Sequence, residues 1–378
     1  MKTNREIEIV DFLKEKARVI DRYIERYVPR KIDNNSLIFR ISPPRYKLDL
    51  EALNKAVADP FWDFIDRGGK RWRPALFLLI CESLGVNSKD VLDFAVIPEI
   101  IHNGTLIADD VEDQSELRRG KPCTYRIFGL DVAVNLSNFM FFLPMLALIF
   151  RRNKIPPERM NKLYEIYIQE MVNLSLGQAI DIAWHKGLVS PYEISEEEYF
   201  QMCAYKTGTL ARMAAKMACV IAGADDSVAE TVGKFAESLG IAFQIQDDIL
   251  DLVGEEFAKG KGGLGKDITE GKLTLMVIHT IKKASASDRK KLIEILEAHT
   301  SDEAEKNKAI SIIKRYGSIE YAKKVAADIV KNSWAEVDKV LPPSEAKEKL
   351  RSLASCLLYT SDAADEGLGV DLGGRRII

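Results

Sequence analysis

Apolar residues recur at helical spacing along almost the whole chain, and sustained strand alternation is absent. Residues three and four positions apart share one face of an α-helix, so this pattern predicts amphipathic helices that each bury one side. The predicted helices span Ile7–Tyr27, Leu50–Asp66, Arg73–Leu84, Val91–Asp113, Lys162–Trp184, Glu196–Ala222, Ser227–Leu252, Lys272–Lys283, Asp288–His299 and Ser318–Leu341. The sequence therefore predicts an all-α protein built around one core.

Changes of pattern divide the chain into three parts. Residues 1–48 are predicted to form a separate helical arm that ends in a proline-containing loop, and residues 49–355 the main helical domain. Residues 356–378 are rich in glycine and small side chains and lack a helical stripe. We expect that last segment to be a disordered or non-native tail.

Composition and charge exclude several classes of protein. Of the 378 residues, 47% are hydrophobic and 29% are charged, which is the balance of a globular chain rather than a disordered one. With a formal net charge of −3, the chain lacks the basic surface that nucleic acid requires of a partner. No two of the five cysteines have CxxC spacing, which argues against a zinc cluster and favours buried thiols.

The N-terminus and the longest apolar run bear on location. Residues 1–30 are charged throughout, so we expect no secretory signal and, by default, a cytoplasmic protein. The run Phe139–Phe150 contains Pro144 and is shorter than the ~20 residues that a membrane span needs. We therefore predict a buried helix in this run and no membrane span.

The segment His102–Arg119 carries the first chemical signal. On a helix, Asp109 and Asp113 lie one turn apart on one face, and His102 lies two turns before Asp109. Asp110 falls at the edge of this polar stripe. A stripe that faces a core is normally apolar, so acids among apolar neighbours indicate a chemical role.

A second acidic stripe lies in the segment 244–251, QIQDDILD. Gln244, Asp247, Asp248 and Asp251 fall within an arc of about 100° on a helix. Isoleucine and leucine flank them, and carboxylates among such neighbours are costly unless cations compensate them. Either stripe alone is more simply explained as a solvent-facing acidic patch. Two such stripes favour a shared oxygen-only pocket, which suits Mg²⁺ bound to carboxylates and a diphosphate.

Basic residues in loops and at helix ends could hold that diphosphate, for which arginine forks are well suited. The candidates are Lys70, Arg71 and Arg73 beside two glycines, Arg118 and Arg119 after the first stripe, Lys206 and Thr207 in an apolar helix, and Lys261, Lys266 and Lys272 after the second stripe. For any single lysine, a solvated surface position is the simpler explanation. That explanation is weakest for Lys206, because its helix is otherwise apolar.

The loop at 260–266, GKGGLGK, also matches G-x-G-x-x-G and approaches a Walker A loop. The first motif needs a preceding strand, whereas a helix is predicted here, and the second needs Ser or Thr where Asp267 stands. A flap that closes over phosphate therefore fits better than a nucleotide-binding loop.

Together these motifs resemble those of the trans-prenyltransferases, the polyprenyl (isoprenyl diphosphate) synthase family. The matches, in the family's order, are GGKRWRP at 68–74, DDVED at 109–113, LRRG at 117–120, GQAID at 177–181, KT at 206–207, QDDILD at 246–251 and GKDITEGKLT at 265–274. The resemblance implies a single-domain isoprenoid-synthase helical bundle around a central cavity, usually homodimeric. It implies condensation of isopentenyl diphosphate with an allylic diphosphate, with three Mg²⁺ ions per active site.

The resemblance also implies roles for individual residues. Mg²⁺ would be held by Asp109, Asp110, Asp113, Asp247 and Asp251. The allylic diphosphate would be contacted by Arg118, Lys206, Thr207, Gln244, Lys261, Lys266 and Lys272. Isopentenyl diphosphate would be held by Lys70, Arg73, His102 and Arg119. The expected catalytic residues among these are Asp109, Asp113, Arg118, Lys206 and Asp247.

The length of the product should depend on the residues one helical turn deeper than Asp109. Gly104 and Thr105 are both small, and bulky aromatics at these positions in the family resemble a floor that ends growth. Small residues predict a deep tunnel and a long product, with geranylgeranyl diphosphate favoured. Two alternatives stay open: Gly104 serves only close helix packing, or the bulky run Phe139–Phe142 supplies the floor.

Two further functions also stay open. A terpene cyclase on the same fold uses one diphosphate and needs no isopentenyl site, so the presence of Lys70, Arg73, His102 and Arg119 argues against it. A catalytically silent partner subunit of a synthase should have lost its acidic motifs, whereas both are present here. The sequence therefore favours an active prenyltransferase.

Overall fold

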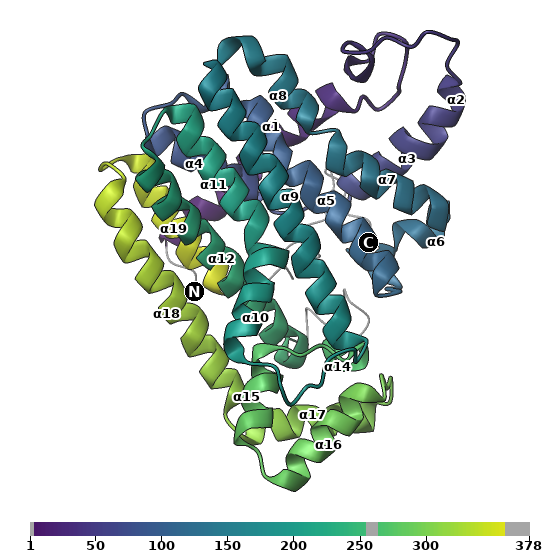
Figure 1. The fold of residues 1–378 in the computed structure, drawn as a ribbon, viewed down its shortest axis with the longest axis vertical. Helices are drawn as coiled ribbons and strands as arrows, with labels where there is room; N and C mark the ends of the chain where they lie inside the picture. The colour runs from purple at the N-terminus through teal and green to yellow at the C-terminus, as the bar shows by residue number, and fades with distance from the viewer. Residues whose placement is uncertain (1–3, 255–263, 360–378) are drawn as a thin grey trace, which may run out of the picture.

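The computed structural model describes residues 4–254 and 264–359. These residues are almost entirely helical, which confirms the all-α prediction (Figure 1). A short antiparallel ladder pairs β1 (Leu117–Arg118) with β2 (Lys121–Pro122). The helices are α1 (Asn4–Tyr27), α2 (Leu50–Leu53), α3 (Asp59–Ile65), α4 (Trp72–Ser83), α5 (Leu92–Glu112), α6 (Thr124–Phe128), α7 (Leu130–Phe142), α8 (Met145–Arg151), α9 (Pro157–His185), α10 (Glu196–Cys203), α11 (Thr209–Ala222), α12 (Asp226–Val253), α14 (Lys266–Glu270), α15 (Leu275–Lys283), α16 (Ala286–Glu297), α17 (Glu303–Arg315), α18 (Ser318–Val340) and α19 (Glu345–Tyr359).

Two of the predicted long helices contain a π-helical turn. The range 50–66 divides into α2, the turn η2 (Asn54–Ala58) and α3, and the range 196–222 divides into α10, the turn η5 (Ala204–Gly208) and α11. A π-helical turn accommodates an extra residue within a helix and is frequent at functional sites. Apolar periodicity does not reveal such a turn, because the residues on both sides of it remain helical.

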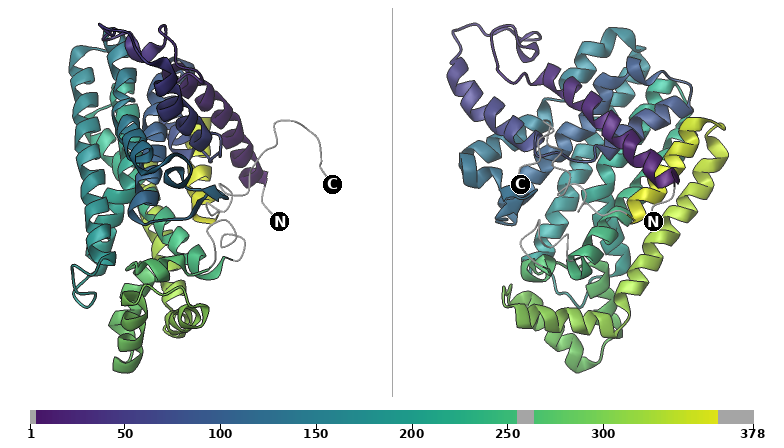
Figure 2. Two further views of the ribbon diagram at one scale, coloured as in Figure 1. Left: turned by 90° about the vertical axis from the view of Figure 1, so that its right-hand side faces the viewer. Right: turned by 180° about the vertical axis from the view of Figure 1, so that it is seen from behind.

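One hydrophobic cluster runs through the bundle from α1 to α19. Within it α12 packs along α18, and α11 packs against α12, α4 and α9. Seen from behind, α1 lies across the back of the bundle beside α19 (Figure 2). Ile20 and Ile24 of α1 are fully buried, so this helix shares the main core instead of standing apart as the arm was expected to do.

The apolar run Phe139–Phe150 is not the single buried helix that its sequence predicts. Helix α7 ends at Phe142, and Pro144, which cannot continue the hydrogen bonding of a helix, precedes α8. Met140 and Leu148 are fully buried, whereas Phe142 is 75% exposed. The prediction is therefore wrong at this break.

One described stretch, Leu130–Lys154, is long and apolar enough to cross a membrane by length and composition alone. Of its most apolar window, 44% is buried inside the molecule. The stretch is weak evidence for a membrane segment, since core helices of soluble proteins pass the same test. The expectation that the chain has no membrane span stays a prediction.

The C-terminal helix α19 continues past Ser355, where the sequence predicts that helical structure ends. Cys356 and Leu357 are 4% and 2% exposed, and their burial in the main core explains the extension. Residues 360–378, the rest of the predicted tail, lie outside the described residues.

Candidate active site

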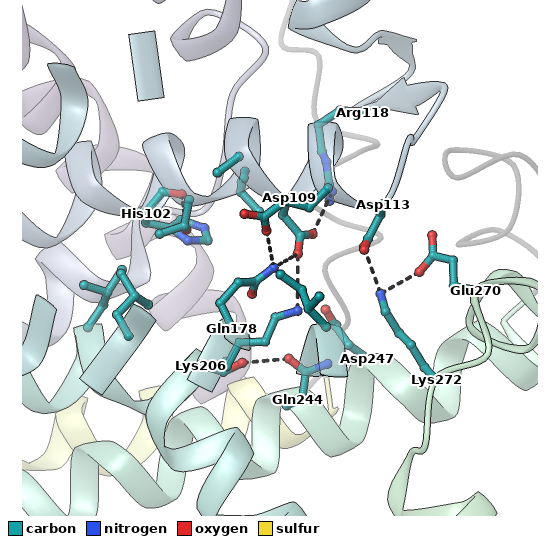
Figure 3. A pocket seen from close by; sticks show the side chains of 18 of the residues that line it. His102, Asp109, Asp113, Arg118, Gln178, Lys206, Gln244, Asp247, Glu270 and Lys272 are labelled. Atoms are coloured by element: carbon teal, nitrogen blue, oxygen red, sulfur yellow. Dashed lines mark hydrogen bonds and ion pairs between the residues drawn. The ribbon is translucent and has the colours of Figure 1, made fainter. Parts of the chain in front are cut away.

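A pocket opens among α5, α9, η5, α12 and α14 (Figure 3). It brings together most of the site residues that the sequence predicts. Those that line it are Arg73, His102, Thr105, Asp109, Asp113, Arg118, Arg119, Lys206, Thr207, Gln244, Asp247, Lys266 and Lys272.

The two acidic stripes face this one cavity. Asp109 and Asp113 reach it from α5, and Asp247 reaches it from α12 on the opposite side (Figure 3). Burial raises the pKa of Asp113 to about 6, although Lys272 opposes that shift. Carboxylates from separate helices therefore converge on a space that a ligand could fill.

The structure does not bring Asp110 or Asp251 to the pocket wall. Asp110 is buried, and its Oδ1 accepts a hydrogen bond from Nε of Arg118 at 2.8 Å. The carboxylate of Asp251 accepts the backbone N–H groups of Lys266 and Asp267, at 3.1 and 3.0 Å, at the start of α14. These two aspartates hold local structure here, and the role as metal ligands that the sequence predicts for them stays a prediction.

Lys206 lies on η5 and contacts carboxylates from two other helices. Its Nζ lies 3.2 Å from Oδ1 of Asp109 and 2.5 Å from Oδ2 of Asp181. Burial lowers the pKa of Lys206, but these two carboxylates outweigh it and raise the pKa above its ordinary value. Likewise, burial raises the pKa of Asp109, but the nearby cations, Lys206 first, outweigh it and hold the pKa well below its ordinary value. Both groups are therefore charged at neutral pH.

Glycines allow η5 to approach its neighbours closely. A Cβ on Gly177 of α9 would lie 2.3 Å from the backbone nitrogen of Lys206. A Cβ on Gly240 of α12 would lie 2.5 Å from the Cα of Gly208 in η5. Because those distances exclude any side chain, the glycines on α9 and α12 set the position of Lys206 and Thr207.

A chain of hydrogen bonds fixes the amide of Gln244 at the pocket wall. Oγ1 of Thr207 donates to Oε1 of Gln244 at 2.7 Å, and Nε2 of Gln244 donates to Oδ1 of Asp248 at 2.8 Å. The hydroxyl of Tyr199 in α10 donates to the other oxygen of Asp248, also at 2.8 Å. Burial raises the pKa of Asp248 to about 7. Asp248 thus acts as a buried support for Gln244.

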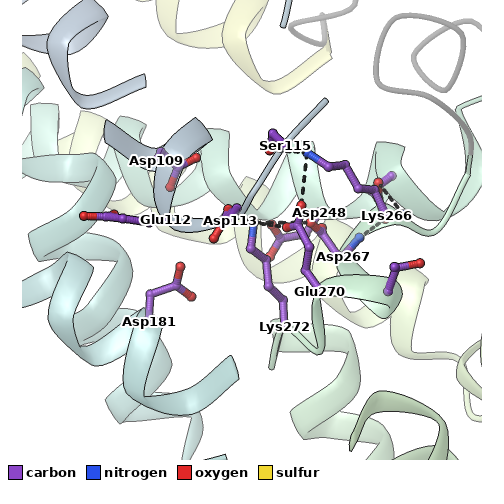
Figure 4. A network of polar contacts seen from close by, with 12 residues as sticks. Asp109, Glu112, Asp113, Ser115, Asp181, Asp248, Lys266, Asp267, Glu270 and Lys272 are labelled. Carbon is purple, nitrogen blue, oxygen red and sulfur yellow. Dashed lines mark hydrogen bonds and ion pairs between the residues drawn. The ribbon is translucent and has the colours of Figure 1, made fainter. Parts of the chain in front are cut away.

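The ends of α14 carry two more cations, Lys266 and Lys272 (Figure 4). Nζ of Lys272 lies 3.3 Å from Oδ2 of Asp113 and 2.6 Å from Oε2 of Glu270. Nζ of Lys266 lies 3.0 Å from Oε1 of Glu270. We call Arg118, Lys206, Lys266 and Lys272 the acid-side cations. The predicted Lys261 lies outside the described residues.

A second polar group gathers where the pocket meets the start of α4, and we call Lys70, Arg73, His102 and Arg119 the α4-side group. Arg73, His102 and Arg119 line the pocket. Lys70 does not line it, although its Nζ lies 6.0 Å from the ring centroid of Phe243, which does. Burial and then the charge of Arg73 lower the pKa of His102 well below its ordinary value, so the imidazole is neutral.

Arg118 and Arg119 are consecutive in the β1–β2 hairpin and have different partners. Nη2 of Arg118 lies 2.6 Å from Oδ1 of Asp110 and 3.5 Å from Oδ2 of Asp109. Arg119 has a φ of 53°, and its Nη1 donates to Oδ1 of Asn103 at 3.3 Å. One short hairpin therefore supplies an arginine to each of the two polar groups.

Of the two predicted product-length residues, only Thr105 lines the pocket. Gly104 faces α7, where a Cβ would lie 2.9 Å from Cβ of Met140 and 3.2 Å from Cε1 of Phe141. The small size of Gly104 therefore serves close packing of α5 against α7. Phe141 itself lines the pocket, so an aromatic from the next helix limits the cavity.

Comparison with known proteins identifies the family. The profile of the family described as "Polyprenyl synthetase" matches residues 54–313, which is more than half of the chain. The chain belongs to the polyprenyl synthetase family. It is accordingly a trans-prenyltransferase of isoprenoid biosynthesis, and this confirms the enzyme class that the sequence motifs predict.

Individual relatives agree with the family match. The prenyltransferase is 35% identical over 232 residues to the short chain isoprenyl diphosphate synthase of Methanothermobacter thermautotrophicus, covering 61% of this chain and 69% of that protein. It is 34% identical over 224 residues to the geranylgeranyl diphosphate synthase of Methanosarcina mazei, covering 59% and 67%. Its fold matches the crystal structure of geranylgeranyl pyrophosphate synthetase from Pyrococcus horikoshii Ot3 with a TM-score of 0.79 and 31% identity, covering 94% and 99%.

Several acceptors and donors in or beside the pocket of the prenyltransferase were not among its predicted site residues, and these include Glu112, Gln178, Asp181 and Glu270. Nε2 of Gln178 donates to Oδ1 of Asp109 at 3.1 Å and to Oε2 of Glu112 at 2.6 Å. The matched segments at 109–113, 177–181 and 265–274 contain these four residues, so the motifs held the signal. The sequence could not show which residues on other helices are their hydrogen-bond and ion-pair partners.

Proposed function

We propose that this prenyltransferase condenses isopentenyl diphosphate with an allylic diphosphate and releases a linear all-trans prenyl diphosphate. The observation that carries the proposal is the single pocket, which two acid-bearing helices and two separate polar groups line. One diphosphate would need only one such group, so two groups support two diphosphate substrates. The names of the archaeal relatives, which are isoprenyl and geranylgeranyl diphosphate synthases, support the same reaction.

Asp109, Asp113 and Asp247 are the residues that would hold magnesium, and we propose three ions per site. The donor set fits, because Mg²⁺ prefers carboxylate oxygens together with substrate phosphates. Among the described residues no three His, Cys, Asp or Glu side chains form a ready-made metal cluster, which accords with a coordination shell that phosphate completes. When bound, the ions would stabilise the charge that develops on the departing diphosphate.

The acid-side cations, with Thr207 and Gln244, would hold the allylic diphosphate. Lys206 and Lys272 contact Asp109 and Asp113 respectively, and Glu270 contacts both Lys266 and Lys272. Binding would turn these lysines from carboxylate to phosphate oxygens, so that each charge keeps a partner of opposite sign. Such preorganised cations stabilise the leaving group without large rearrangement.

The α4-side group would hold isopentenyl diphosphate. Arg73 and Arg119 supply charge, while the neutral imidazole of His102 can donate a hydrogen bond without adding to the repulsion between them. Leu106 and Phe243 contribute apolar wall to the pocket. Walls of this kind exclude water from an allylic cation, which water would otherwise quench.

Geranylgeranyl diphosphate is the product that we favour. Thr105, Phe141 and Leu174 line the pocket as less polar wall, and we infer that the aromatic ring of Phe141 limits the prenyl chain. Gly104 is in close contact with α7, which supports Phe141 and not Gly104 as the residue that limits the prenyl chain. A terpene cyclase and a silent partner subunit are not favoured, because the α4-side group and both acidic stripes are present.

We also propose a homodimer, with the exposed apolar side chains of α7 and α9 at its interface. These two helices adjoin, because the hydroxyl of Tyr167 in α9 donates to the backbone oxygen of Phe141. The exposed apolar side chains are Leu130, Val134, Phe142, Ile168, Val172 and Leu176. Val172→Asp should shift the mass measured by sedimentation toward the monomer, and an unchanged mass would contradict this interface. A cytoplasmic location stays a prediction.

The proposed reaction is tested by incubating the purified chain with Mg²⁺, labelled isopentenyl diphosphate and each allylic starter in turn. Chromatography then sizes the products. Asp109→Asn and Asp247→Asn should each lower kcat by on the order of 10²-fold or more. Asp90→Asn, which changes an exposed acid far from the pocket, should leave kcat unchanged and is the matched control.

Two results would overturn the proposed function. Cyclic hydrocarbons as the main product would indicate a terpene cyclase. A folded chain that turns over none of the starters, with or without isopentenyl diphosphate, would indicate a silent subunit.

A further inference from the structure

Arg71 stands in the middle of the GGKRWRP motif, but its environment differs from that of Lys70 and Arg73. Its side chain is 1% exposed and does not line the pocket. Its φ and ψ of 51° and 35° place it in the left-handed region, directly before α4. That conformation is unfavourable for a residue with a Cβ, so other contacts must hold Arg71 in it.

Arg71 uses all three nitrogens of its guanidinium group to join separate parts of the fold. Nε donates to Oδ1 of Asp21 in α1 at 3.0 Å, and Nη1 donates to Oε1 of Glu99 in α5 at 2.9 Å. Nη1 and Nη2 also donate to the backbone oxygens of Gly68 and Ile65, at 3.2 and 3.0 Å. The arginine therefore ties the loop before α4 to both helices.

Glu99 extends this connection to Arg119. Its Oε1 also accepts a hydrogen bond from Nδ2 of Asn103 at 2.9 Å, and Oδ1 of Asn103 accepts one from Arg119 at 3.3 Å. Asn103 is fully buried and Glu99 is 2% exposed. Gly69 completes the arrangement, because a Cβ there would lie 2.9 Å from Nη1 of Arg71 and 3.2 Å from Nη2 of Arg119.

We propose that Arg71, Glu99 and Asn103 are positioning residues for the isopentenyl diphosphate site, and that Asp21 makes helix α1 part of its support. The inference rests on the proposed function, because the α4-side group defines that site. Arg71 fixes the backbone that presents the residues on either side of it. Glu99 and Asn103 fix the side chain of Arg119. The hydrogen bonds of this network do not involve the metal-holding aspartates or the lysines on the acid side.

The test needs a variant that weakens the network without leaving a buried charge alone. Removing the charge of Arg71 would leave Glu99 buried without its arginine, a change that strongly destabilises folded proteins. Arg71→Lys keeps the charge and loses the planar fork that reaches several acceptors at once. Asp21→Asn is milder still, because the side chain of Asp21 is 42% exposed.

With the allylic starter saturating, Arg71→Lys should raise KM for isopentenyl diphosphate roughly tenfold. KM for the allylic diphosphate and kcat should stay within about twofold. Asp21→Asn should raise the same KM about threefold. Arg212→Lys is the matched control, because Arg212 is a buried arginine that contacts Glu170 and Glu237 and does not line the pocket. It should not change the ratio of the two KM values.

A rise in KM for isopentenyl diphosphate alone supports the inference. A merely structural role would instead weaken the binding of both substrates, or would lower only the melting temperature of the protein. Equal rises in both KM values, or no rise in either, overturn it and leave the proposed function standing. If Arg71→Lys does not fold, Asp21→Asn decides by the same criterion. An unmodified chain that forms no condensation product overturns the proposed function instead.

Discussion

Replacing Gly177 by alanine tests how η5 positions Lys206, which the proposed function makes a catalytic residue. The added Cβ would lie 2.3 Å from the backbone nitrogen of Lys206, whereas ordinary contacts begin at 3.4 Å, so α9 and η5 must separate by about 1 Å. Overpacking of this kind costs about 1–3 kcal/mol, and the better helix propensity of alanine returns ~1 kcal/mol. The expected net loss is about 0–2 kcal/mol in the free energy of unfolding.

The effect of Gly177→Ala on catalysis should be larger than its effect on stability. A displacement of about 1 Å at a catalytic group can cost about 10²-fold in rate, and the backbone of Lys206 would move away from α9 by about that distance. Gly233→Ala is the matched control, because the three atoms nearest to its Cβ, at 2.9–3.5 Å, all belong to the flexible side chain of Lys216 and none to a backbone. That variant should keep kcat and gain up to ~1 kcal/mol in stability.

Denaturant unfolding and steady-state kinetics on the two glycine variants measure both quantities. If Gly177→Ala matches Gly233→Ala in kcat and in the free energy of unfolding, close approach of α9 does not set the position of Lys206. The reasoning from the glycine contacts would then be refuted.

Three further changes have defined outcomes. Lys206→Met removes a cation that contacts two carboxylates, so kcat/KM should fall by about 10²–10³-fold in the condensation assay, and a loss below tenfold would contradict its role. Phe141→Ala should lengthen the product on chromatography, and an unchanged distribution would remove Phe141 as the limit of the cavity. Because folding lowers the pKa of His102, its contribution to stability is present above the unfolded pKa and is lost as pH falls through 6.5 and below. The free energy of unfolding should therefore drop less between pH 7.5 and 5.5 in His102→Gln than in the unmodified chain. Equal drops in the two proteins would contradict the lowered pKa of His102.

The helices and the facing acids could be predicted because both depend on local periodicity. Asp109 and Asp113 share a face through the geometry of one helix, and the same holds for the stripe that includes Asp247. Apolar neighbours on both helices indicate that these faces turn inward. That the two faces meet in one pocket followed from the cost of burying acids alone.

Contacts between helices could not be predicted in this way. Asp110 sits on the edge of the first stripe, and only the fold shows that it pairs with Arg118 and does not itself line the pocket. Asp251 keeps the spacing of a metal ligand, yet the backbone N–H groups at the start of α14 bind its carboxylate. In both cases a local partner with the right geometry competes with the metal that the spacing suggests.

Two features depend on packing that the sequence does not show. A glycine at 104 is compatible with a tunnel or with a close helix contact, and the distance to Met140 selects the contact. The π-helical turn at η5 is equally hidden, because Lys206 appears in a helical pattern whether or not the turn is there. The sequence indicates only that a lysine in an apolar helix needs partners of opposite charge.

Under the proposed function, the β1–β2 hairpin has a consequence for how two diphosphates would be held relative to each other. Arg118 and Arg119 are joined by one peptide unit, so their Cα atoms stay about 3.8 Å apart whatever the surrounding helices do. The spacing between the two proposed diphosphate sites is therefore set partly by the covalent geometry of the peptide, which heating and helix motion leave unchanged. Inserting a single residue between Arg118 and Arg119 would turn one guanidinium group away from its polar group and would change this spacing.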